Sequence, residues 1–192
     1  MIRSLCSNLL LKAPRAVIPL WSTALLYSPA VAVRLSNGQV FFDYPPVLVK
    51  ASTTFPATRF SGSTYKFTLA VPENAGEPLQ RVTFEQKRNA DEIDFKRNQT
   101  RVLKVERSHS PNSESTVSIS QNPSTKAVTV VLDPPVPPGS TVTIRLLPER
   151  NPFISGYYLF GVTAFPAGDN SYGQFLGYGR LYFYDNDRGR PG

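Results

Sequence analysis

The feature that most constrains the fold is an alternation of apolar and polar residues that recurs along the chain. Tyr65, Phe67, Leu69 and Val71 share one parity, and polar or small residues fill the positions between them. A two-residue period is typical of a strand with one buried face, and β-branched and aromatic residues favour such strands. The same period recurs in five further segments: 82–85, 117–120, 128–132, 141–146 and 158–164.

The segments between these runs have turn chemistry, and we find no long run with helical apolar spacing after residue 32. The proline-rich stretch Asp133–Pro138 predicts a stiff connector, because proline cannot donate to a sheet ladder. Residues 107–115 predict a solvated loop rich in serine. Eight to ten short strands with this spacing predict an all-β, Ig-like two-sheet β-sandwich. A small closed β-barrel is the alternative.

Residues 1–32 have the three parts of a secretory signal peptide. Basic residues come first, an apolar run follows over residues 16–27, and Ala30 and Ala32 end the segment as a small-residue cleavage site. The apolar run is shorter than the ~20 residues of a membrane-spanning helix, so we expect no stable span after cleavage. Cleavage would leave residues 33–192 as a single β-sandwich domain with a short polar C-terminal tail.

Cleavage would also change the chemistry of the chain. Three basic residues would be removed, which lowers the formal charge from +7 to +4, and Cys6 would be lost. The remaining chain would hold one histidine, His109, and neither cysteine nor methionine. Metal and haem sites and Cys–His catalysis need such side chains, so we expect no metal, no cofactor and no catalytic triad. Basic and acidic residues nearly balance over residues 85–107, so we expect no nucleic-acid partner.

Two motifs bear on chemical function. The glycines at 173, 177 and 179 lack the lysine and helix of a phosphate-binding loop, so they predict turns and bulges. A hydrolase would need two carboxylates across a cleft, and the candidates are Asp91, Glu92, Asp94 and Asp169. Basic residues flank the first three, which indicates a solvated and charge-balanced segment.

The C-terminal third is unusually aromatic, with ten Tyr and Phe residues between positions 157 and 184. Half of them lie at alternate positions and are expected in the core. Gly168 and the polar residues after it break the preceding strand. We therefore expect residues 168–178 to form an exposed loop or edge that presents Tyr172, Phe175 and Tyr178 as a candidate binding surface. The alternative is that these three side chains plug the open end of the sandwich.

Several segments together carry a family resemblance: Asn74–Gln80, Asp133–Gly139, Gly156–Gly168 and Gly177–Tyr184. In order and spacing they resemble a family of exported cyanobacterial proteins known as a domain of unknown function, number 2808. The likeness runs from about Val40 to Tyr184. It implies a secreted cyanobacterial protein and transfers no catalytic residue.

These observations predict an exported protein of the cell envelope that is not an enzyme and acts as a binding or structural module. Its expected partner is an envelope polysaccharide or an envelope protein. The alternative is a hydrolase acting on envelope polysaccharide or peptidoglycan. The expected location is the periplasm or the cell exterior, with the thylakoid lumen as a third choice.

Overall fold

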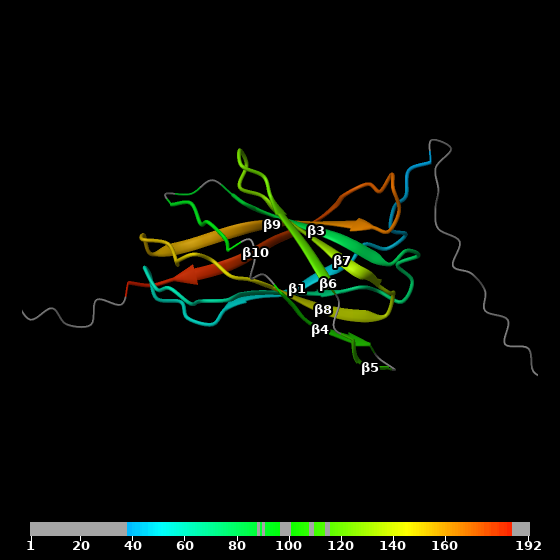
Figure 1. Ribbon diagram of the computed structural model, residues 1–192, viewed down its shortest axis with the longest axis horizontal. Helices are drawn as coiled ribbons and strands as arrows, with labels where there is room; N and C mark the ends of the chain where they lie inside the picture. The colour runs from blue at the N-terminus through cyan, green and yellow to red at the C-terminus, as the bar shows by residue number, and fades with distance from the viewer. Residues whose placement is uncertain are drawn as a thin grey trace, which may run out of the picture.

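The computed structural model describes residues 38–87, 89, 91–96, 101–107, 110–113 and 116–185. The predicted signal segment, His109 and the tail after Asp185 lie outside these residues. The described part of the chain contains ten strands and no helix, so it offers no helix that could cross a membrane. Figure 1 shows the strands β9, β10 and β3 in one layer and β1, β8 and β4 in the other.

Each layer is a five-stranded antiparallel sheet. The first has the order β1-β2-β8-β4-β5, with β1 Val47–Thr53, β2 Tyr65–Ala70, β8 Ser140–Leu146, β4 Arg101–Arg107 and β5 Ser110–Ser113. The second has the order β10-β9-β3-β7-β6, with β10 Gln174–Phe183, β9 Gly156–Pro166, β3 Leu79–Gln86, β7 Val128–Val136 and β6 Thr116–Gln121. Both sheets end in edge strands, so the predicted two-sheet sandwich is confirmed and the closed barrel is wrong.

The alternating residues form the core as the sequence predicts. Successive residues of β2 and β8 are buried and half-buried in turn, and β9 continues the pattern. Aromatic rings from the two sheets interlock at the centre, where the ring centroids of Phe67 and Phe84 lie 4.6 Å apart and those of Phe67 and Phe160 5.8 Å apart. Because these rings come from β2, β3 and β9, the two sheets are joined by packing across the sandwich.

The proline-rich stretch corrects one expectation, because β7 continues through Pro134 and Pro135 to Val136. The register explains how. On β3, Leu79 lies opposite Val136 and Arg81 opposite Val131, so the prolines fall in a bulge that needs no ladder donor. On the other side, the pairing with β6 stops at Asp133.

The predicted loop over residues 107–115 is also wrong in part. Arg107 ends β4, and Ser110–Ser113 form β5, which pairs back on β4 at the edge of the sheet. Edge pairing uses the hydrogen bonds of the backbone, so a serine-rich segment can form it without an apolar pattern.

One buried amide joins the loops at the end of the sandwich where β8 connects to β9. The side chain of Asn151 donates to the carbonyl oxygens of Phe55 and Ala57 at 2.7 Å each and accepts from the Tyr65 hydroxyl at 3.0 Å. Its backbone N–H donates to the carbonyl of Phe60. Asn151 is 1% exposed and Tyr65 is fully buried, so these two side chains depend on each other, whereas the Phe55 carbonyl also accepts from Ser63 Oγ.

We predict that Asn151→Ala lowers the free energy of unfolding by about 3 kcal/mol, because it leaves the buried Tyr65 hydroxyl without its acceptor and removes the donor to two loop carbonyls. Asn151→Asp should lose at least as much, because it keeps an acceptor for Tyr65 but places a buried carboxylate oxygen against the two carbonyls. Urea denaturation of both variants checks this, with the exposed Asn74→Ala as the matched control. Equal midpoints for Asn151→Ala and Asn74→Ala would contradict the role assigned to Asn151.

Burial also raises the pKa of Tyr65 far above its usual value of 10, with smaller contributions from Tyr158 and Asp91. The folded protein therefore keeps this proton at a pH where the unfolded chain releases it. Below pH 10 this group does not change the free energy of unfolding. As the pH rises above 10, the free energy of unfolding falls by about 1.4 kcal/mol per pH unit for one such group. Denaturant melts between pH 9 and 11.5 should show this loss, and Tyr65→Phe should reduce its slope. An unchanged slope in Tyr65→Phe would show that other groups cause the alkaline loss.

Candidate functional site

The three aromatic residues that the sequence singles out all lie on the surface. Tyr172 is 53% exposed, Phe175 58% and Tyr178 52%. Tyr172 lies in the turn before β10, and the other two lie on β10, which is an edge strand. None of the three side chains plugs the end of the core. The buried side chains of β10 are Leu181 and Phe183, farther along the strand.

A bulge in β10 brings Phe175 and Tyr178 onto one face. Phe175 lies opposite Thr163 of β9, Tyr178 lies opposite Gly161, and the register shifts between Phe175 and Gly177. Gly177 has a φ of +112°, which residues with side chains rarely adopt. Residues three apart normally point to opposite faces of a strand, but here their rings meet edge to face at 5.2 Å. The predicted bulge is therefore confirmed at Gly177, whereas Gly179 pairs regularly with Phe160.

Tyr172 does not join this pair. Its ring packs on Phe41 with a centroid distance of 4.9 Å, and its backbone N–H donates to the carbonyl of Val40. The structure thus divides the candidate surface into a pair on β10 and a separate contact on the segment before β1.

Phe175 and Tyr178 form one wall of an open hollow on the outer face of the second sheet. We call it the aromatic hollow. Its volume is about 330 Å³, and its lining is Thr83, Glu85, Gln86, Lys87, Gly161, Thr163, Phe175 and Tyr178. Gly161 leaves room for the two rings, because a Cβ at this position would lie 3.3 Å from Phe175 Cε2 and 3.6 Å from Tyr178 Cε1. The hollow therefore combines two exposed rings with hydroxyl, amide and charged groups.

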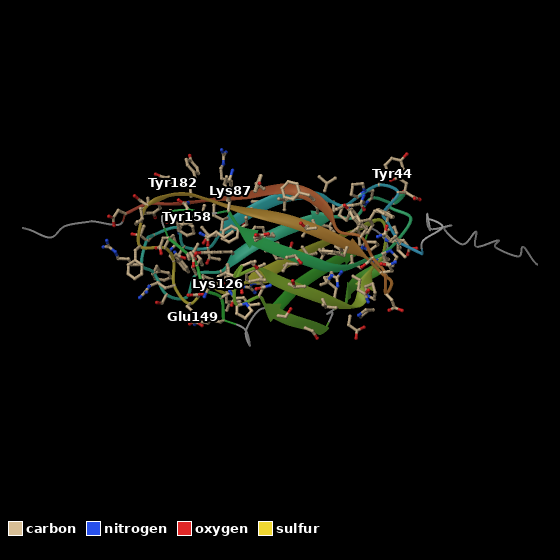
Figure 2. All side chains as sticks on the ribbon, turned by 90° about the horizontal axis from the view of Figure 1, so that it is seen from above. Tyr44, Lys87, Lys126, Glu149, Tyr158 and Tyr182 are labelled. Atoms are coloured by element: carbon tan, nitrogen blue, oxygen red, sulfur yellow. The ribbon has the colours of Figure 1, made fainter. Side chains whose placement is uncertain are left out.

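The same face carries further rings and cations that the sequence analysis missed. Tyr157 and Tyr182 are 58% and 50% exposed, and their rings lie 4.8 Å apart. Arg180 lies 5.2 Å from the Tyr157 ring centroid, and Lys87 Nζ lies 5.6 Å from that of Tyr178. Figure 2 shows Tyr182 and Lys87 on the same side toward one end of the molecule, with Tyr44 at the other end. The sequence does hold a signal for their exposure, because Tyr157 and Tyr182 are each adjacent in the chain to a buried residue of the opposite strand face, Tyr158 and Phe183.

A second hollow adjoins the first at the end of β3. We call it the polar hollow. Its volume is about 250 Å³, and its lining is Glu85, Gln86, Lys87, Asn89, Glu92, Ser124, Thr125 and Lys126. Gln86 holds one wall in place, since its amide donates to the carbonyl of Asp91 at 2.7 Å and accepts from the N–H of Ile93 at 3.0 Å. On the other side, Lys126 forms an ion pair with Asp94 at 3.0 Å.

The carboxylates considered for hydrolysis have separate places in the fold. Asp91 accepts a short hydrogen bond from the N–H of Phe153, just before β9 begins, and Asp94 pairs with Lys126. Asp169 follows the other end of β9, beyond Pro166. Of the four, Glu92 lines the polar hollow, and the other three line neither the polar nor the aromatic hollow. Within the described residues, no group of three or more His, Cys, Asp or Glu side chains is placed to hold a metal ion.

Comparison with known proteins gives a family and several distant structures. A family described as "Protein of unknown function (DUF2808)" matches residues 39–183. The collagen-binding domain of a Staphylococcus aureus adhesin is 8% identical, with 70% of this chain and 97% of that chain covered at a TM-score of 0.36. BcpA, the major pilin subunit of Bacillus cereus, is 10% identical, with 72% and 40% covered at a TM-score of 0.39. No curated protein matches the sequence.

The exposure of the rings predicts how each contributes to stability. Phe175→Ala and Tyr178→Ala should each change the free energy of unfolding by less than about 1 kcal/mol, because both side chains are half in water. Phe160→Ala should cost about 3–5 kcal/mol, because Phe160 is 1% exposed and packs in the aromatic core. Denaturation midpoints test the contrast. A loss for Phe175→Ala as large as that for Phe160→Ala would show that the rings of the hollow serve the core.

Proposed function

The chain belongs to the DUF2808 family, and we propose that its sandwich is a non-catalytic binding module that holds polysaccharide of the cell envelope on the outer face of β9 and β10. The observation that carries this proposal is the pair Phe175 and Tyr178, exposed beside the polar groups of the aromatic hollow. The proposal includes export by the signal segment at residues 1–32 and a location in the periplasm or outside the cell.

The chemistry of the aromatic hollow suits a sugar. The C–H face of a pyranose ring is apolar and packs on an aromatic ring, while its hydroxyls need hydrogen-bonding partners around the rim. Phe175 and Tyr178 supply the aromatic surface, and Thr83 and Thr163 supply hydroxyl groups. A site with a few placed polar groups beside aromatic side chains is typical of small-molecule recognition.

The cost of keeping these rings exposed supports a binding role. A strand with water on one face needs no aromatic residue there, and exposed rings on an unpaired edge increase the risk of self-association. Here four half-exposed rings, at 157, 175, 178 and 182, lie on two neighbouring strands. Catalysis by paired carboxylates is the weaker proposal, since Asp91 and Asp94 are engaged in contacts that hold loops together.

We predict that the double variant Phe175→Ala/Tyr178→Ala binds insoluble envelope polysaccharide at least about tenfold more weakly than the unmodified chain, because it loses both stacking surfaces. Sedimentation of purified protein with the washed polysaccharide fraction measures the bound share. Tyr44→Ala is the matched control, because Tyr44 is 57% exposed at the far end of the molecule (Figure 2).

Unfolding midpoints of the three proteins must agree for the comparison to hold. The proposal is overturned if the double variant is retained as well as the unmodified chain, or if Tyr44→Ala reduces binding equally.

A further inference from the structure

Resting on the function proposed above, we infer that the ligand is a neutral, linear glycan longer than a disaccharide that lies across the strands, from the aromatic hollow to the polar hollow.

The two hollows form one path over the second sheet. Both are lined by Glu85 and Gln86, which end β3, and by Lys87, which follows them. The strand order places β3 between β9, which carries Gly161, and β7, which follows the turn at Ser124 and Thr125. A chain stacked on Phe175 and Tyr178 would therefore cross the end of β3 and reach the turn between β6 and β7.

The sizes of the two hollows favour a polymer. The volumes of about 330 and 250 Å³ each lie near or below the lower end of the range for small-molecule pockets. Each hollow has room for only a few sugar units. The polar hollow therefore adds contacts only for a ligand that extends beyond the aromatic hollow. Affinity should therefore rise with chain length until both hollows are filled.

The charges favour a neutral ligand. Glu85 and Glu92 oppose Lys87 and Lys126 along the path, and Lys126 is already paired with Asp94. A polyanion would gain nothing from such a balanced lining, because each cation it meets is accompanied by a carboxylate. Hydroxyl groups remain as the main recognition elements of the polar hollow, on Ser124 and Thr125, and they match the hydroxyls of a sugar.

The walls of the path are held in place before any ligand arrives. Gln86 uses both ends of its amide to fix residues 91–93, and the amide of Asn89 donates to the carbonyl of Tyr157 at 2.7 Å. In the turn, Asn122 Oδ1 accepts from the N–H groups of Ser124 and Thr125. A preformed surface loses little conformational entropy on binding, which favours recognition of a flexible chain.

Titration calorimetry with neutral disaccharides and hexasaccharides tests the inference. The probes are the cello-, chito- and malto-oligosaccharides, with hexagalacturonate as the acidic comparison. We expect at least one neutral hexasaccharide to bind about tenfold or more tightly than its disaccharide and more tightly than hexagalacturonate. Glu92→Ala/Ser124→Ala should weaken hexasaccharide binding by about 3- to 10-fold and leave disaccharide binding unchanged. Phe175→Ala/Tyr178→Ala should weaken both.

The control variant Ser61→Ala/Glu149→Ala makes the same chemical changes at exposed positions outside both hollows and should bind like the unmodified chain. The inference is overturned by equal affinities for di- and hexasaccharide, by preference for hexagalacturonate, or by unchanged binding in Glu92→Ala/Ser124→Ala. It is also overturned if no neutral hexasaccharide binds while the envelope polysaccharide is still retained. If the unmodified chain is not retained by the envelope polysaccharide at all, the result instead counts against the proposed function.

Discussion

The hydrogen bond between the Tyr65 hydroxyl and the Asn151 side chain is the interaction on which much of this sandwich depends. Tyr65 begins β2, and Asn151 lies in the connection from β8 to β9, so the bond ties the first sheet to the loop that leads to the second. The same amide holds the backbone of the β1–β2 connection through Phe55 and Ala57. Because polar groups fix these loops, Phe55 and Phe60 can remain partly in water and stack on each other at 4.9 Å.

The candidate site depends on a local departure from strand regularity. Without the bulge near Gly177, Phe175 and Tyr178 would face opposite sides of β10, and one of them would compete with the core residues for space. Gly161 then provides the room that both rings occupy above β9. Two glycines, one for its backbone conformation and one for its missing side chain, therefore make the aromatic hollow.

Much of the fold could be predicted from the sequence because burial leaves a two-residue period. Runs such as Tyr65–Val71 and Tyr158–Ala164 gave the strands of the core and the sandwich class. The predicted runs did not include β1, in which exposed and half-buried residues do not alternate, and they did not include β4, β5 or β10. The prolines of β7 were taken for a connector. For the site, the turn before β10 indicated exposed aromatics. The separation of Tyr172 and the contribution of Lys87 arise from packing between strands, which spacing along one strand does not encode.

The edge position of β10 has a consequence for how this protein behaves at high concentration. An aromatic strand with free backbone groups would ordinarily template the addition of a neighbouring molecule. Here the hydrogen-bonding repeat is interrupted after Phe175, and Arg180 stands among the exposed rings. A second strand could not pair in register along the whole edge, and a second copy would bring its own arginine against the first. The bulge that shapes the aromatic hollow thus also opposes self-association, because it keeps an exposed aromatic edge strand from pairing with a second copy of the protein.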